Sequence, residues 1–175
     1  FVGIVIDFNR TSAIVESVGK NHIIEQSAEG IMVGAIDAGI MLAQLQSAAE
    51  ALGYGTTAIG AVRKESEAFI ELFNLPQKTF LALGCTIGVP TEKAKNAPLK
   101  PRVALDTFVM QERYESEKVR QGALAYEQTL KAFRDKTGSG SMPTYAEITS
   151  SYYADIYYRK TAKSLVAQGF AFKDE

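Results

Sequence analysis

A segment of 22 residues, MVGAIDAGIMLAQLQSAAEALG at positions 32–53, limits the possible folds of this chain more than any other feature. In a helix, its apolar and small side chains cover most of the circumference: Ile36, Ile40, Met41, Leu42, Leu45, Ala49 and Leu52. Gly53 then follows at a position where glycine commonly ends a helix. Because a helix that is apolar on most sides needs to be covered, we predict a buried central helix around which the other elements pack.

Three apolar segments that contain glycine predict β-strands: FVGIVI at 1–6, GYGTTAIGAV at 53–62 and KTFLALGCTIGVP at 78–90. Between the last two, RKESEAFIELFNLP predicts an amphipathic helix that ends at Pro76, with Phe69, Leu72 and Phe73 facing inward. Helices and strands are mixed without a regular βαβ alternation, and the glycine spacing does not match the dinucleotide-binding fingerprint. The pattern therefore favours an α+β fold.

The sequence changes character after residue 90. TEKAKNAPLKPR at 91–102 predicts a loop, and the chain from about Tyr114 onward predicts polar helix. KTGSGSMP at 136–143 interrupts this helix with a segment rich in Gly and Ser, which predicts a flexible loop. The last part is helical and rich in tyrosine, as is typical of a tail that wraps around a neighbouring subunit. We predict a single domain over 1–175, with a core of 1–113 and a helical extension of 114–175.

The composition argues against several classes of function. A net charge of −1, without any run of Lys and Arg, argues against nucleic acid as a partner. Cys85 lies in an apolar run, and together with the single His22 it forms no metal-ligand cluster and no catalytic triad. If the protein is an enzyme, we expect a bound cofactor to supply the chemistry. We find neither the ~20 apolar residues of a membrane span nor a signal-like segment, so we expect a cytoplasmic protein without a membrane partner.

Lys100 and Arg102 form a candidate anion-binding pair. They lie in APLKPRVAL, where Pro98 and Pro101 favour extended backbone geometry. Residues two apart in an extended segment point to the same side, so both cations could face one anion. Simple solvation of both side chains is the alternative, because the backbone N–H groups that usually complete a phosphate site are not visible in the sequence.

The order of several short segments resembles the flavin-dependent nitroreductase superfamily. These segments are EALGYGTTAIGAVR, FNLPQ, LGCTIGVP, LKPR, a later RY, a helix with several tyrosines and a terminal QGF. The resemblance extends over almost the whole chain and points to the branch of oxygen-insensitive NAD(P)H nitroreductases and NADPH-flavin oxidoreductases. It implies a central, mainly antiparallel sheet flanked by helices, with a C-terminal helical extension that embraces the partner subunit of a homodimer.

The resemblance also implies the residues that bind FMN. In this branch the lysine and arginine of KPR bind the flavin phosphate, so Lys100 and Arg102 carry over. The segment Ala58, Ile59, Gly60 and Ala61 would lie against the isoalloxazine ring, with the amides near Gly60 and Ala61 reaching its O4/N5 edge. Ala61 stands where the family usually has a second glycine. For Arg63 two roles remain open, a contact to the cofactor and an ion pair with a carboxylate at the start of the following helix.

Two departures from the family pattern affect these expectations. The Arg- and Ser-bearing N-terminal segment of the family has no match here, and FVGIVI opens directly as a strand, so we suspect that a preceding segment is absent from this numbering. The basic loop that contacts the 2′-phosphate of NADPH in some members aligns with KTGSGSMP, which offers only Lys136. The sequence leaves open whether NADPH or NADH is the co-substrate.

The implied activity is reduction of nitroaromatics, quinones or free flavins. NAD(P)H would deliver a hydride to FMN N5, leave, and be replaced by the acceptor, so that no protein acid, base or nucleophile is required. The alternative is a flavin- or nucleotide-binding member of the same superfamily that has no catalytic activity.

Overall fold

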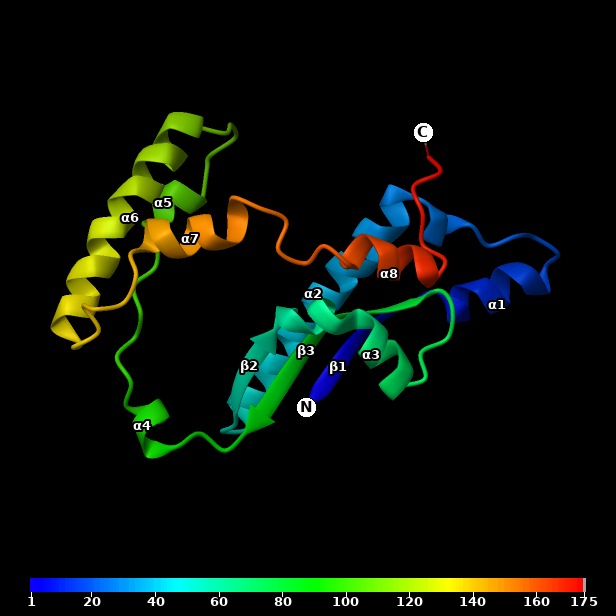
Figure 1. Ribbon diagram of the computed structural model, residues 1–175, viewed down its shortest axis with the longest axis horizontal. Coiled ribbons are helices and arrows are strands. Elements are labelled where there is room, and N and C mark those ends of the chain that lie inside the picture. The colour runs from blue at the N-terminus through cyan, green and yellow to red at the C-terminus, as the bar shows by residue number, and fades with distance from the viewer. Residues whose placement is uncertain (175) are drawn as a thin grey trace. The chain divides into compact units, whose positions relative to one another are not determined.

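The computed structural model describes residues 1–174, which form two compact units (Figure 1). The first unit contains residues 1–91 together with the chain from Tyr158 onward, and the second contains residues 92–157. The division expected from the sequence was a core of 1–113 and an extension of 114–175. The structure divides the chain differently, because the end of the chain packs with the first unit. Phe170 is 1% exposed there and its ring lies 6.1 Å from that of Phe8.

The first unit is built on an antiparallel sheet of three strands, β1 (Val2–Asp7), β2 (Gly55–Ile59) and β3 (Thr79–Gly88), in the order β1-β3-β2. All three strands were predicted from their apolar segments, and the antiparallel sheet is confirmed. The central strand β3 is buried over most of its length, and Cys85 within it is fully buried, as expected. The pairing of β1 with β3 shifts between Ile4, which faces Leu83, and Val5, which faces Leu81. This β-bulge leaves Ala82 without a partner in β1.

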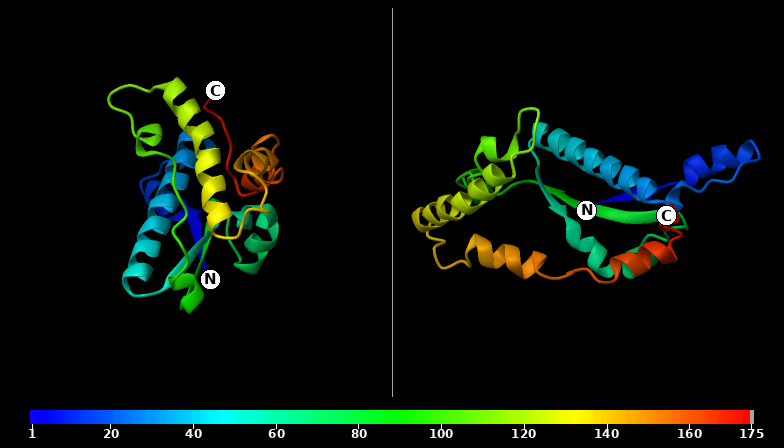
Figure 2. Two further views of the ribbon diagram at one scale, coloured as in Figure 1. Left: turned by 90° about the vertical axis from the view of Figure 1, so that its left-hand side faces the viewer. Right: turned by 90° about the horizontal axis from the view of Figure 1, so that it is seen from above.

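Helix α2 (Ala28–Ala51) runs along this sheet and contacts β1, β3 and β2 (Figure 2). Its buried side is a stripe of mostly small residues: Gly30, Gly34, Ala38, Leu42 and Ala49. A Cβ atom on Gly34 would lie 2.5 Å from Ile6 Cγ2, so only glycine allows this approach of the helix to the sheet. Gly53 ends the helical region with φ of +84°, as predicted.

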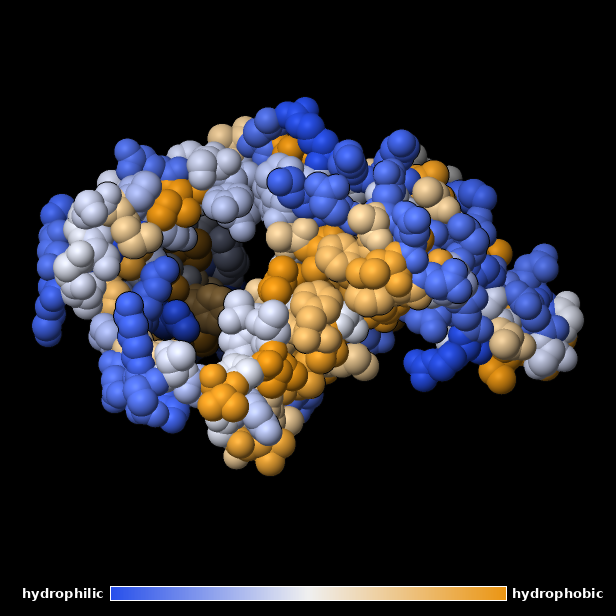
Figure 3. Space-filling model, turned by 60° about the horizontal axis from the view of Figure 1, so that its bottom comes forward, coloured by the Kyte–Doolittle hydropathy of each residue, from blue (hydrophilic) through white to orange (hydrophobic). Residues whose placement is uncertain are grey.

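The opposite side of α2 is exposed, which corrects the prediction of a fully buried helix. Ile36 is 56% exposed, Ile40 57% and Met41 61%. The sheet covers only one side of the helix. Hydrophobic side chains gather on the molecular surface in the view of Figure 3. By length and composition alone α2 is also long and apolar enough to cross a membrane, which was not expected from the sequence. A core helix packed on a sheet meets the same criterion.

Four shorter helices and one helical turn complete the first unit: α1 (Asn9–Ser17), η1 (Ile24–Gln26), η2 (Gly60–Glu65), α3 (Ser66–Leu72) and α8 (Thr161–Ala167). In α3, Phe69 is half-buried between the rings of Phe1 and Phe73. Leu72 is 70% exposed and Phe73 is 42% exposed, so the prediction that both face inward was wrong. The helix ends at Leu72, and Asn74 shortly after it takes a left-handed φ of 47°.

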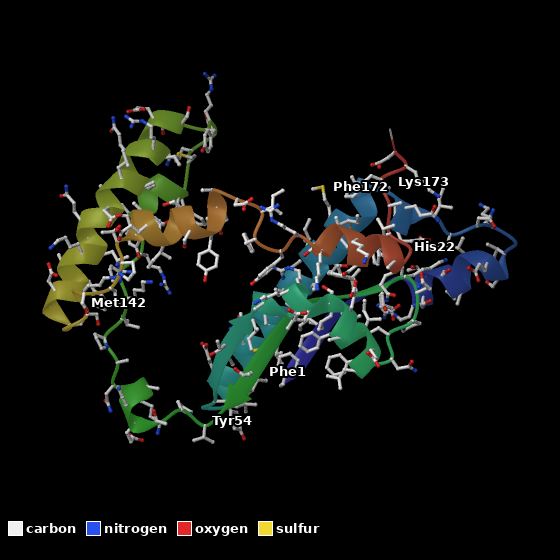
Figure 4. The ribbon with its side chains drawn as sticks, viewed as in Figure 1. Phe1, His22, Tyr54, Met142, Phe172 and Lys173 are labelled. Atoms are coloured by element: carbon white, nitrogen blue, oxygen red, sulfur yellow. The ribbon has the colours of Figure 1, made fainter. Side chains whose placement is uncertain are left out.

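A buried polar network, which the sequence did not predict, joins α1, η1 and the start of β3. The Glu25 carboxylate lies 2.7 Å from His22 Nδ1 and 3.6 Å from Lys78 Nζ (His22 is labelled in Figure 4). Lys78 also donates to Ser12 Oγ at 2.7 Å, and His22 Nε2 lies 2.9 Å from Thr11 Oγ1. Glu25 is 1% exposed, so this network replaces the water that the carboxylate loses on folding.

The second unit contains α4 (Glu92–Lys95), α5 (Leu105–Phe108), α6 (Ser116–Lys136) and α7 (Tyr145–Tyr153). The polar helix predicted after Tyr114 is α6. The rings of Tyr126 and Tyr145 meet edge to face at 5.1 Å, where α7 packs on α6. Glu127 of α6 accepts hydrogen bonds from the backbone N–H groups of Tyr145 and Ala146, and so holds the first turn of α7 against α6.

Candidate functional site

The segment 58–61 forms the junction between β2 and η2 in the first unit. The ladder between β2 and β3 ends at Ile59, which faces Gly84, so the peptides of Gly60 and Ala61 lie beyond the sheet. The N–H groups of Gly60 and Ala61 take part in none of the turn and loop hydrogen bonds of residues 1–174. Ala61 is exposed, whereas Val62 directly after it is buried. The junction therefore carries the first N–H groups of η2, which have no acceptor within the helix, on a turn that the buried Val62 anchors.

Arg63 does not make the ion pair with a carboxylate that the sequence left open. Its Nη1 donates to the carbonyl oxygen of Ala82 at 2.6 Å, and its guanidinium lies 5.9 Å from the centre of the Tyr158 ring. Within residues 1–174, no carboxylate forms an ion pair with Arg63. The side chain is therefore a cation held by a backbone carbonyl and an aromatic face.

Lys100 and Arg102 lie in the second unit on an irregular segment between α4 and α5. Both are exposed, while Pro101 between them and Val103 after them are half-buried, which is the alternation expected of an extended segment. Tyr126 of α6 fixes this segment by donating its hydroxyl to the Pro101 carbonyl at 2.9 Å. Neither cation has a hydrogen-bond or ion-pair partner in the part of the chain that the structure describes. Both charges are thus available for an anion.

Lys136 is the exposed last residue of α6, and it opens the predicted loop 136–143. The loop is irregular, as predicted, but its two ends are tied together by Arg134, which is 8% exposed. Arg134 Nη1 donates to the Pro143 carbonyl at 2.5 Å, and the Arg134 carbonyl accepts from Ser139 N–H at 2.8 Å. The sequence did not single out Arg134, because its partners are backbone carbonyl and N–H groups that any residue type provides.

The structure groups these residues into two sets. Ala58, Ile59, Gly60 and Ala61 are contiguous in the first unit, and Lys100, Arg102 and Lys136 belong to the second. In residues 1–174 there is no group of three His, Cys, Asp or Glu side chains that could hold a metal ion. The backbone donors of the first unit suit a polar ring edge, and the uncompensated cations of the second unit suit an anion.

Comparison with known proteins identifies the family. Residues 21–89 match the model of the "Nitroreductase family", and residues 100–173 match that of the "Nitroreductase family, C-terminal domain". The solved structure of B. megaterium NfrA2 is 30% identical, with a TM-score of 0.89 over 97% of this chain and 68% of that one. The chain belongs to the nitroreductase family. The nitroreductase-like α+β fold expected from the sequence is thereby confirmed.

Other members of the nitroreductase family show similar levels of identity. The oxidoreductase YcnD from Bacillus subtilis has a TM-score of 0.89 and 33% identity over 96% of this chain and 68% of its own. A protein named FMN reductase [NAD(P)H] from Bacillus subtilis strain 168 is 33% identical over 169 residues, which are 94% of this chain and 66% of that protein. A CR(VI) reductase from Pseudomonas sp. strain G-1 is 36% identical over 137 residues, which are 77% of this chain and 54% of that protein. The chain thus spans between about half and two thirds of the length of these two curated relatives.

Proposed function

We propose that this member of the nitroreductase family is an FMN-dependent NAD(P)H oxidoreductase. The similarity to the FMN reductase of Bacillus subtilis, which extends over 94% of this chain, is the observation that supports the proposal most strongly. Bound FMN would supply the hydride chemistry, accepting a hydride from NADPH or NADH and passing electrons to a nitroaromatic, a quinone or a free flavin. The protein itself would bind and orient the reactants, which agrees with a site made of backbone donors and cations.

The peptides of Gly60 and Ala61 fit the polar edge of the isoalloxazine ring. Their N–H groups lie beyond the sheet ladder, on a turn that the buried Val62 anchors. Ser66 Oγ adds to this anchoring by donating to the Arg63 carbonyl at 2.9 Å. Donors fixed in this way bind a carbonyl oxygen or ring nitrogen without a further loss of backbone entropy. Ala58 and Ile59 would lie beside the ring.

Lys100 and Arg102 fit the phosphate of FMN. A phosphate prefers planar, bidentate arginine together with lysine, and both side chains are exposed and without local carboxylate partners in residues 1–174. Each charge-assisted hydrogen bond to a phosphate contributes roughly 1.5–3 kcal/mol. Lys136, the first residue of the loop 136–143, is our candidate for contact with the nicotinamide co-substrate.

The proposal includes a homodimer in the cytoplasm. The exposed apolar side of α2 needs a cover, and a second copy of the chain would provide it. The free, buried Cys85 is compatible with a reducing compartment. Small-molecule electron acceptors are the expected partners.

Titration of the flavin-free protein with FMN, followed by flavin fluorescence, tests the proposal. Arg102→Ala is expected to weaken FMN binding by roughly ten- to a hundredfold, since it removes one charge-assisted contact to the phosphate. Lys93→Ala removes an exposed cation from the same unit and serves as the matched control, with unchanged affinity. The purified wild-type protein should also oxidise NADPH or NADH when a quinone is present. A wild-type protein that binds no FMN would contradict the proposed function, and normal affinity in folded Arg102→Ala would remove the phosphate assignment.

A further inference from the structure

The central strand β3 contains a residue, Ala82, that pairs with neither neighbouring strand. Ala82 has no partner in β1, because the register passes from Leu83 to Leu81, and the β2 ladder ends two residues away at Gly84. Ala82 is 8% exposed, so its carbonyl oxygen is largely removed from water. A buried carbonyl without a donor costs free energy comparable to a lost hydrogen bond.

Arg63 supplies the missing donor from the turn that follows β2. Its Nη1 lies 2.6 Å from the Ala82 oxygen, and the Tyr158 ring faces the guanidinium at 5.9 Å. A hydrogen bond from a charged donor is stronger than one between neutral groups, and the planar guanidinium keeps its remaining N–H groups in a fixed direction. The side chain therefore joins three parts of the first unit: η2, the bulge of β3 and the returning C-terminal segment.

The same guanidinium packs against Gly60. A Cβ atom placed on Gly60 would lie 3.2 Å from Arg63 Nη2, which is closer than side chains normally approach. The φ of Gly60 lies outside the left-handed range, so its backbone conformation does not require glycine. A larger residue at this position would require the Arg63 guanidinium to shift by a few tenths of an ångström. The Arg63 side chain thus packs against Gly60, and its hydrogen bond to the Ala82 carbonyl holds it in this place.

We propose that Arg63 is a positioning residue for the peptides of Gly60 and Ala61, acting through its hydrogen bond to the bulge carbonyl of Ala82. This inference rests on the proposed function, in which these two peptides bind the polar edge of FMN. Arg63 and the residues proposed to hold the phosphate belong to different units. Its effect on FMN is expected to operate through the geometry of the turn.

The decisive experiment compares three variants of the full chain by FMN titration and thermal melting. Arg63→Met keeps a long side chain but has no donor, and it is expected to raise the Kd for FMN about tenfold, equivalent to loss of about 1.4 kcal/mol. Arg63→Lys keeps a charged donor and should restore the Kd to within about threefold of wild type. Lys64→Met removes the neighbouring exposed cation and should leave the Kd unchanged.

A fourth variant separates positioning from general stability. Glu25→Gln disrupts the buried network around η1, and should lower the melting temperature without changing the Kd for FMN. If Glu25→Gln raises the Kd as much as Arg63→Met at a similar loss of stability, Arg63 is only structural and the inference is wrong. A folded Arg63→Met protein with a Kd within twofold of wild type would also overturn it.

A measurement without flavin keeps the inference distinct from the proposed function. In the flavin-free wild type, backbone ¹⁵N order parameters of Gly60 and Ala61 are expected near 0.85, the value of a rigid backbone, and in Arg63→Met they should fall below about 0.6. Arg63→Lys should return them toward the wild-type value. If the wild type binds no FMN, these order parameters still test the positioning role. Unchanged order in folded Arg63→Met would refute it, whether or not FMN binds.

Discussion

Glu25 illustrates, at the scale of single residues, how a charge is kept inside this fold. Burial by itself raises the pKa of the carboxyl, but the hydrogen bonds from the backbone, His22 and Gln26, together with the nearby Lys78, outweigh it and lower the pKa below its ordinary value of 4.5. Glu16 also lies 3.7 Å from Lys78, so this lysine is shared between two carboxylates. The ionised form of Glu25 is therefore the one that stabilises the folded protein.

The lowered pKa predicts the direction of the pH dependence. A carboxyl whose pKa is lower in the folded state adds stability above pH 4.5, and this contribution is lost as the pH falls through the folded-state pKa. At pH 7 we expect Glu25→Gln to lower the free energy of unfolding by about 1.5–3 kcal/mol, because a charged hydrogen bond to His22 is lost. Melting temperatures of both proteins between pH 3 and 7 check this. The difference should shrink toward acid pH, and a constant difference would show that ionisation of Glu25 is irrelevant.

Sequence reasoning found few of these residues, for a physical reason. His22 and Glu25 are three positions apart, but Lys78 lies 53 positions beyond Glu25 in the sequence. No local sequence pattern predicts a contact over this separation. Arg63 was singled out, yet its partner was expected to be a carboxylate. Its actual partner is the carbonyl of Ala82, which pairs with neither neighbouring strand, and the sequence of one strand does not reveal how strands pair.

At the scale of elements, α7 depends on groups outside its own sequence for its start. Thr144 and Glu147 form a capping box, and Glu127 of α6 accepts from two further N–H groups of the first turn. A helix of nine residues is marginal in isolation, so these contacts are needed to fix where it begins. A carboxylate at a helix N-terminus also interacts favourably with the helix dipole.

Glu127→Gln is therefore expected to weaken α7. The amide retains one oxygen acceptor for two N–H groups and loses the charge. The first turn of α7 should therefore open about tenfold more often, because its stability against local unfolding falls by about 1 kcal/mol or slightly more. Hydrogen exchange of the peptides covering 144–153 measures this directly. Glu117→Gln, at an exposed site on the same helix paired with Arg120, is the control and should leave exchange in α7 unchanged. Equal protection in Glu127→Gln and wild type would contradict the capping role.

The strands and most helices were predictable because their signals are local. The apolar runs of β1, β2 and β3 are bounded by glycine or polar residues, and Gly53 marks the end of α2. The direction in which each helix faces was harder to predict. In α2 the small residues Gly34 and Ala38 pack against the sheet, while the larger Ile36 and Ile40 face outward, the reverse of the usual assignment of large apolar side chains to the core.

At the scale of the whole molecule, this reversal suggests how the chain associates. The outward side of α2 carries Met32, Val33, Ile36, Ile40 and Met41, all more than 40% exposed. Exposed apolar patches of this kind mark interaction surfaces in soluble proteins. Within the described part of α2 the only charged side chains are Glu29, Asp37 and Glu50, so little on the helix opposes a close approach of a second copy.

The proposed homodimer predicts the effect of a single charge on this surface. Light scattering should give the wild-type protein about twice the chain mass of 19.0 kDa, and Ile40→Asp should shift it toward the monomer, because two carboxylates would be buried against apolar side chains without partners. Ile14→Asp places the same charge on the exposed surface of α1 and is the control that should remain dimeric. FMN titration of the Ile40→Asp monomer then asks whether one copy alone holds the cofactor. A wild-type monomer, or an Ile40→Asp protein that stays dimeric at micromolar concentration, would show that α2 is not the dimer interface.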